Sequence, residues 1–179
     1  MSRFIEMFGD PQSPIGNTKK GSELFRFSSG SAMTKTNLSD EYMYPCFGGN
    51  GITGMSQSYL IDYPTYVLGR VGEYCGCVHV VPAKSWITDN AIFIKEFLTD
   101  DYDFNYLYYL LKFIDFHRMA KETGQPKITQ EPLLNYSFII PDKNRQVLFS
   151  SLAKQADKSK FELREAIKRV ESMMKSLMN

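Results

Sequence analysis

The sequence predicts an α+β fold, with a twisted, mixed or antiparallel sheet, packed helices and a long C-terminal coiled-coil helix. Short segments rich in β-branched and aromatic residues occupy residues 22–94. Glycine and proline separate these segments so often that an antiparallel sheet is favoured over alternating βαβ units. Apolar residues then recur at helical spacing over 103–121 and, in heptads, over 147–179.

Length and composition are those of an ordinary globular protein. The chain has 179 residues, 43% apolar and 23% charged, which suits one domain with a modest appendage. It contains no apolar run long enough to cross a membrane, and its first residues lack the apolar core of a signal peptide. Its three cysteines do not suggest a disulfide framework. We therefore expect a cytoplasmic protein.

The elements of the domain follow from local signals. A helix is expected over 1–8, with Gly9 just past its end. Strands are expected at 23–27, 65–69, 73–81 and 86–94. Asp103 begins a second helix, which should run to about residue 121 before Gly124 ends it. A loop over 124–129, a short helix over 130–135 with Thr129 as its N-cap, and a strand over 136–141 complete the domain.

The tail carries a heptad seam. Its positions are Phe149, Leu152, Ala156, Ser159, Leu163, Ala166, Val170, Met173 and Leu177. A helix over 147–179 would be roughly 50 Å long, which exceeds what so small a domain needs to cover its core. The seam is therefore expected to face another helix, and the alternative is a helix folded back on its own domain. We divide the chain into a helix end (1–10), a domain (11–145) and a long helix (146–179).

Glycines at 49, 51 and 54 match the G-x-G-x-x-G spacing of a dinucleotide-binding loop. Such a site requires a helix directly after the glycines, but Pro64 follows too soon for one. The pair Asn50-Gly51 favours a tight turn instead. We expect no cofactor here.

The sequence gives little support for a catalytic site or a metal-binding site. Cys75, Cys77 and His79 alternate and could share one face of a strand, but neighbouring strand positions do not surround a metal. No G-x-S-x-G elbow is present. The sequence therefore predicts no catalytic residue and no metal site.

Three polar loops contain side chains that bond base edges or phosphates: Lys35 in the first, Arg70 in the second, and Thr123, Gln125, Lys127 and Thr129 in the third. The alternative is that these are ordinary solvated loops. Charge does not decide between the two, because the last 33 residues carry seven basic and four acidic groups and the rest of the chain is slightly acidic. A strongly basic nucleic-acid binder is disfavoured, but a local basic face is not.

Seven sequence segments follow one another in an order that resembles a known protein family. The segments are ELFRFSSGSAMTK, YPCFGGNGITG, PTYVLGRVGEYCGCVHVV, WITDNAIFI, NYLYYLLK, TGQPKIT and LLNYSFIIP, followed by the heptad helix. In this order they resemble one target-recognition domain and spacer helix of a type I restriction–modification specificity (S) subunit. The resemblance implies sequence-specific recognition of double-stranded DNA. It also implies that methylation and cleavage belong to methyltransferase and restriction subunits, which bring S-adenosylmethionine, ATP and magnesium.

The polar loops and the heptad seam supply the expected contacts. Candidate DNA-binding residues are Lys35, Asn50, Arg70, Lys84, Thr123, Gln125, Lys127 and Thr129. Candidate helix-pairing residues are Leu152, Ala156, Leu163, Ala166, Val170, Met173 and Leu177. Family members usually have two recognition domains and two helices, and residues 2–11 resemble the end of the central helix. We therefore expect a half-subunit, or the second half of a longer one, that dimerises through its tail or pairs with another half. The alternatives are a coiled-coil adaptor that reads no DNA and a small metal- or nucleotide-binding enzyme.

Overall fold

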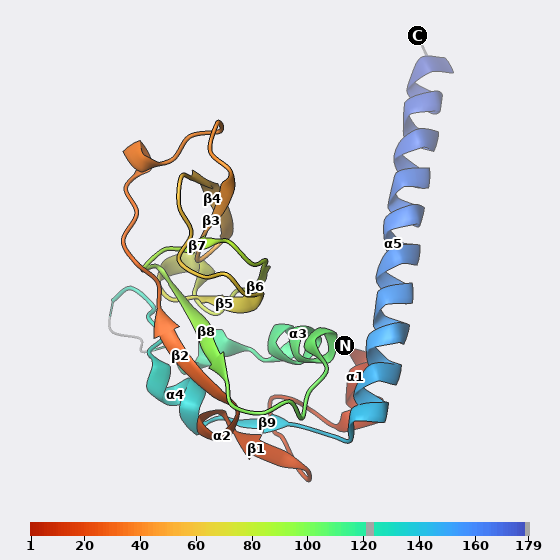
Figure 1. Cartoon of the computed structure of the whole chain (residues 1–179). Coiled ribbons are helices and arrows are strands. Elements are labelled where there is room, and N and C mark those ends of the chain that lie inside the picture. Colours follow the sequence, from red (N-terminus) through yellow and green to blue (C-terminus); the bar gives the residue numbers. More distant parts are fainter. Residues whose placement is uncertain (121–123, 178–179) are drawn as a thin grey trace.

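The computed structural model describes residues 1–120 and 124–177 and combines a mixed α+β domain with one long projecting helix (Figure 1). The α-helices are α1 (Ser2–Phe8), α2 (Gly21–Leu24), α3 (Phe104–Phe113), α4 (Gln130–Asn135) and α5 (Lys143–Leu177). The strands are β1 (Thr18–Lys20), β2 (Phe25–Ser29), β3 (Tyr44–Gly48), β4 (Gly51–Ser56), β5 (Thr65–Gly69), β6 (Val78–Val81), β7 (Trp86–Ile87), β8 (Ala91–Phe97) and β9 (Ser137–Ile139). None of the described helices combines the length and the apolar content of a membrane span.

The strands form three small sheets. Four strands pair in the order β2-β8-β5-β6, all antiparallel, and β1 pairs with β9. The third sheet has the order β4-β3-β7, in which β3 and β7 are parallel. The predicted mixed, mainly antiparallel architecture is thus confirmed.

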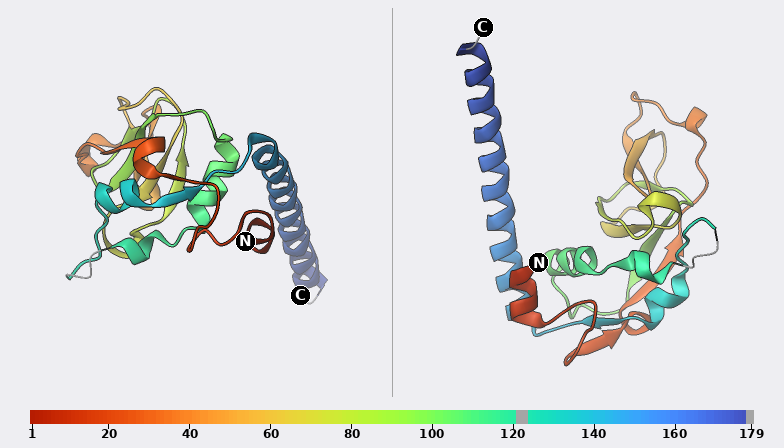
Figure 2. Two further views of the ribbon diagram at one scale, coloured as in Figure 1. Left: turned by 90° about the horizontal axis from the view of Figure 1, so that it is seen from below. Right: turned by 180° about the vertical axis from the view of Figure 1, so that it is seen from behind.

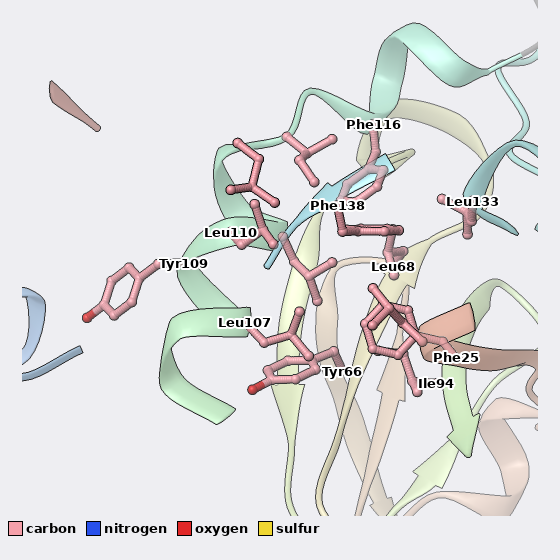
Figure 3. Close-up of a cluster of buried hydrophobic side chains, with 14 of the residues drawn as sticks. Phe25, Tyr66, Leu68, Ile94, Leu107, Tyr109, Leu110, Phe116, Leu133 and Phe138 are labelled. Carbon is pink, nitrogen blue, oxygen red and sulfur yellow. The ribbon is translucent and has the colours of Figure 1, made fainter. Parts of the chain in front are cut away.

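The main core lies between the four-stranded sheet and α3 (Figure 3). Tyr66 and Leu68 of β5 are buried together with Leu107 and Leu110 of α3, and Phe138 of β9 is enclosed in the same cluster. The helix begins as predicted, because the Asp103 carboxylate accepts a hydrogen bond from the Tyr106 N–H at 2.9 Å.

The predicted length of this helix is wrong. The helix ends at Phe113, Ile114 adopts an extended conformation, and a short 3₁₀ turn covers Phe116–Met119. Both Ile114 and Phe116 are buried in the core. A continuous helix would have carried one of these two neighbours away from the core, since residues two apart lie on different helix faces.

Helix α5 has two environments. Its first turns pack against α1 and α3, where Phe149 contacts the rings of Phe4 and Tyr109 with centroids 5.3 and 5.6 Å away. The C-terminal part of the helix rises away from the domain, which all views show (Figure 2). The tail therefore does not fold back on its own domain over this part, and Leu163 and Val170 are 62% and 55% exposed.

Candidate nucleic-acid interface

The glycine-rich segment forms a β-hairpin turn between β3 and β4. Gly48 pairs with Gly51, which leaves Gly49 and Asn50 as the two turn residues and places Asn50 exposed at the tip. Gly51 has a φ of 90°, a conformation that favours glycine. The predicted tight turn is confirmed, although the two central residues are Gly49-Asn50 rather than Asn50-Gly51. Strand β4 begins at Gly51 and includes Gly54, so no helix begins directly after these glycines to receive a pyrophosphate.

The turn packs directly against the chain just after β5. A Cβ atom added to Gly49 would lie 3.2 Å from the Asn90 carbonyl oxygen and 3.3 Å from the Gly69 Cα. The Arg70 N–H in turn donates to the same Asn90 carbonyl at 2.9 Å. Three backbone segments that are distant in sequence therefore meet at van der Waals or hydrogen-bond distance.

The loop over 124–129 extends this arrangement. The Ile128 N–H donates to the Arg70 carbonyl at 2.9 Å, and the Gly72 N–H donates to the Pro126 carbonyl at 3.0 Å. Val71 and Lys127 form an isolated antiparallel bridge. We call the four connected segments, residues 48–51, 69–72, 88–90 and 124–129, the loop cluster.

The loop cluster brings together five of the predicted contact residues. Asn50, Gln125 and Lys127 are exposed on it, and Arg70 is half-buried. The Gln125 amide lies beside Gly72, where an added Cβ would be 3.1 Å from its nitrogen. Thr129 lies at the end of the cluster as the N-cap residue of α4, but its side chain makes no capping hydrogen bond.

Other predicted contacts lie elsewhere. Lys35 belongs to a 3₁₀ turn (Lys35–Asn37), and Lys84 lies in the β6–β7 turn with a φ of 57°. Among the described residues, no hydrogen bond or ion pair links either lysine to the loop cluster. Thr123 falls outside the residues that the structure describes.

Three buried polar atoms border the glycine turn without a hydrogen-bond partner among the described residues: Arg70 Nε, His79 Nε2 and Thr88 Oγ1. A Cβ on Gly48 would lie 3.5 Å from Thr88 Oγ1, and one on Gly51 would lie 3.3 Å from the His79 ring. Burial lowers the pKa of His79, which favours its neutral form. Buried polar groups are ordinarily paired, so these three atoms are exceptions.

Sequence reasoning missed the contribution of residues 88–90. The Arg70 guanidinium donates to the Asp89 carbonyl at 3.4 Å, so this turn orients the arginine through its backbone. The available signal was the turn-forming pair Asp89-Asn90, but nothing local indicated that it would meet Arg70.

The predicted alternation of Cys75, Cys77 and His79 on one strand is wrong. Strand β6 begins only at Val78, because Gly76, with a φ of 88°, interrupts the extended chain. Cys75 is buried and Cys77 is exposed. Within residues 1–120 and 124–177, no group of three or more His, Cys, Asp or Glu side chains is placed to hold a metal ion.

Comparisons with known proteins agree on the family. The family model of the type I restriction modification DNA specificity domain matches residues 17–171. The specificity subunit of the type I restriction enzyme EcoprrI of Escherichia coli is 24% identical over 146 residues, which is 79% of this chain and 36% of that protein.

Solved structures show the same fold. A type I restriction-modification S subunit from M. genitalium superimposes with a TM-score of 0.69 at 19% identity, over 83% of this chain and 42% of that one. The HsdS subunit from Thermoanaerobacter tengcongensis gives 0.62 at 16% identity, over 92% and 44%. A chain from a structure on complex assembly and conformational transition of the type I R-M system gives 0.72 at 18% identity, over 98% and 47%.

The chain thus spans less than half the length of each of these relatives. The family match, in contrast, covers most of this chain, from the first strand to well into α5. The chain therefore belongs to the family of type I restriction modification DNA specificity domains.

Proposed function

We propose that this chain reads one half of a split double-stranded DNA target through its loop cluster and thereby selects the site on which methyltransferase and restriction subunits act. The chain itself makes or breaks no bond in this proposal. S-adenosylmethionine, ATP and magnesium would be bound by the partner subunits. The observation that carries the proposal is the loop cluster, in a chain whose family is defined by DNA specificity.

The chemistry of the loop cluster suits DNA. Arginine can bond guanine O6 and N7 together, asparagine and glutamine can bond adenine N6 and N7, and lysine neutralises phosphate. Arg70, Asn50, Gln125 and Lys127 supply all three kinds of contact from one connected surface. The backbone pairing between segments 69–72 and 124–129 holds Arg70, Gln125 and Lys127 next to one another.

The exposed seam of α5 supplies the pairing surface. Apolar side chains such as Leu163, Val170 and Met173 are more than half exposed on a helix that stands clear of its domain. We infer that this seam pairs with a second copy or with another half-subunit. An antiparallel twofold pairing would place two recognition domains at opposite ends of the helices.

Mapping methylated sites tests the proposal. The chain is combined with a matching methyltransferase subunit, and methylation of random DNA is read by sequencing. A split palindromic target is expected from a homodimer of this chain, and an asymmetric one from pairing with another half. Methylation without sequence preference, or none that depends on this chain, would contradict the proposal.

Replacing Arg70 or Lys127 by alanine should weaken DNA binding by the assembled complex. A lost base contact costs about 1–3 kcal/mol, or roughly five- to 150-fold in affinity, whereas a lost phosphate contact weakens all sequences alike. Fluorescence anisotropy with specific and scrambled duplexes, at fixed salt, distinguishes the two losses.

Matched controls are Arg26→Ala and Lys20→Ala, which remove exposed basic side chains outside the loop cluster. Both controls should bind DNA as the parent does, and all four variants should keep its oligomeric state. If Arg70→Ala and Lys127→Ala also bind normally, the loop cluster is not the DNA-reading surface.

A further inference from the structure

A buried polar network joins α5 to the start of α3. Gln146 of α5 is fully buried, and its side-chain oxygen accepts a hydrogen bond from the Asp103 N–H at 2.7 Å. Its side-chain nitrogen donates to the carbonyls of Asp101 at 2.8 Å and Pro141 at 2.7 Å. One side chain therefore binds the segment before α3, the N-cap of α3 and the segment before α5.

The next turn of α5 uses the same cap. Ser150, which is 4% exposed, donates to Asp103 Oδ1 at 2.5 Å. That oxygen also accepts from the Tyr106 N–H at 2.9 Å, which is the capping bond of α3. The orientation of α5 is thus tied to the first turn of α3 through one carboxylate oxygen.

A third contact lies two turns farther along α5. The Tyr109 hydroxyl of α3 donates to Asp157 Oδ2 at 2.6 Å. Burial is the largest cause of the raised pKa of Tyr109, and the neighbouring Asp157 raises this pKa further. The hydroxyl therefore keeps the proton that it donates.

The three contact residues of α5 lie on one face. At 3.6 residues per turn, Gln146, Ser150 and Asp157 fall within about 40° of one another around the helix and span roughly 16 Å along it. A single contact would act as a hinge. Three contacts spread along one face resist tilting of the helix. Hydrogen bonds are directional and therefore hold its angle, whereas the neighbouring contacts between aromatic rings can slide.

The length of α5 beyond Ser150 amplifies any tilt. The helix from Ser150 to Lys175 is about 38 Å long at roughly 1.5 Å per residue, so a tilt of about 5° moves its far end by roughly 3 Å. That displacement is about the rise of one base pair, since one turn of roughly 10 base pairs spans about 34 Å. Discrimination between spacings that differ by one base pair therefore requires this junction to be stiff.

We propose that Asp103, Gln146, Ser150, Tyr109 and Asp157 form a rigid joint that fixes the angle between α5 and the recognition domain and so sets which distance between half-sites the paired reader accepts. The inference rests on the proposed function, in which two recognition domains are held apart by paired helices. In this proposal the five residues of the joint position the reading surface without touching DNA.

Two sets of variants test the joint. Gln146→Leu removes three hydrogen bonds at nearly constant volume, and Ser150→Ala with Tyr109→Phe removes two hydroxyl groups with little change in shape. The matched controls are Gln155→Leu, and Ser151→Ala with Tyr108→Phe, which change the same residue types outside the network. The milder double variant, Ser150→Ala with Tyr109→Phe, keeps the test valid if Gln146→Leu does not fold.

Spin labels measure the angle in the protein itself. Labels are attached at Ser22→Cys and Lys168→Cys in a Cys77→Ser background, and labelled chain is diluted with unlabelled chain so that only distances within one chain count. Both joint variants should widen the distance distribution by about twofold or more, because the long helix converts small tilts into displacements of several ångströms. Unchanged widths in folded joint variants would overturn the proposal.

Methylation of a spacer library gives the functional readout. Duplexes carry the same half-sites with spacers up to about two base pairs shorter or longer, a range set by the rise per base pair. Joint variants should accept neighbouring spacers that the parent and controls reject, while half-site sequence preference stays unchanged. If the joint variants keep the half-site sequence preference and accept only the parent's spacer length, the joint proposal alone is overturned. If the parent itself shows no half-site preference, the proposed function is overturned.

Discussion

Replacing both Leu163 and Val170 by aspartate is expected to abolish self-association, or pairing with another half-subunit. Both side chains are more than half exposed on the projecting part of α5, and both are positions of the heptad seam. Burying a leucine or valine contributes about 1.5–3 kcal/mol each, and an unpaired carboxylate buried in the seam adds a further cost. Sedimentation equilibrium of the purified chain over a range of concentrations measures the effect.

The control adds the same two charges to another face of the helix. Ser151→Asp with Ser172→Asp places both carboxylates well away from the seam, at exposed positions, and should leave the association constant nearly unchanged. If the Leu163→Asp and Val170→Asp protein associates as the parent does, the seam is not the pairing surface.

Truncating Phe149 to alanine is expected to destabilise the protein by about 3–5 kcal/mol. The ring is 4% exposed and lies at the centre of an aromatic cluster that joins α1, α3 and α5. Its centroid is 5.3 Å from that of Phe4, 5.6 Å from Phe8 and 6.2 Å from Tyr106. Removing it would leave a cavity in contact with all three helices.

Phe161→Ala is the matched control, since this ring lies on the same helix but is 64% exposed. Its loss should change the free energy of unfolding by no more than about 0.5 kcal/mol. Urea unfolding of both variants, in the Leu163→Asp and Val170→Asp background to remove self-association, gives the comparison. Equal costs for the two would mean that the aromatic cluster does not hold α5 to the domain.

Local signals predicted the elements whose causes are local. The N-terminal helix, the helix start at Asp103 and the short helix over 130–135 lie where the sequence placed them, and the glycine turn lies within one residue of its predicted place. The heptad pattern predicted a long helix, which begins at Lys143, earlier than Val147 where the pattern starts. The end of α3 was not predictable in this way, because burial of Ile114 and Phe116, rather than a local stop signal, ends that helix.

The candidate site depended on contacts between distant segments. The sequence identified Arg70, Gln125 and Lys127 by residue type, but only the backbone pairing of 70–72 with 126–128 makes them neighbours. The same folding leaves Lys35 and Lys84 in other loops, although their residue type made them equal candidates.

Sequence alone thus determined the α+β class, the glycine turn and the existence of a long helix with an apolar seam. These features follow from periodicity and turn chemistry within a few residues. The tertiary structure decided which loops form one surface and how α5 is fixed to the domain. Both depend on hydrogen bonds between residues far apart in the chain, such as Asp103 with Gln146 and Arg70 with Ile128. No local pattern encodes these pairings, because each partner is satisfied only when the whole domain has folded.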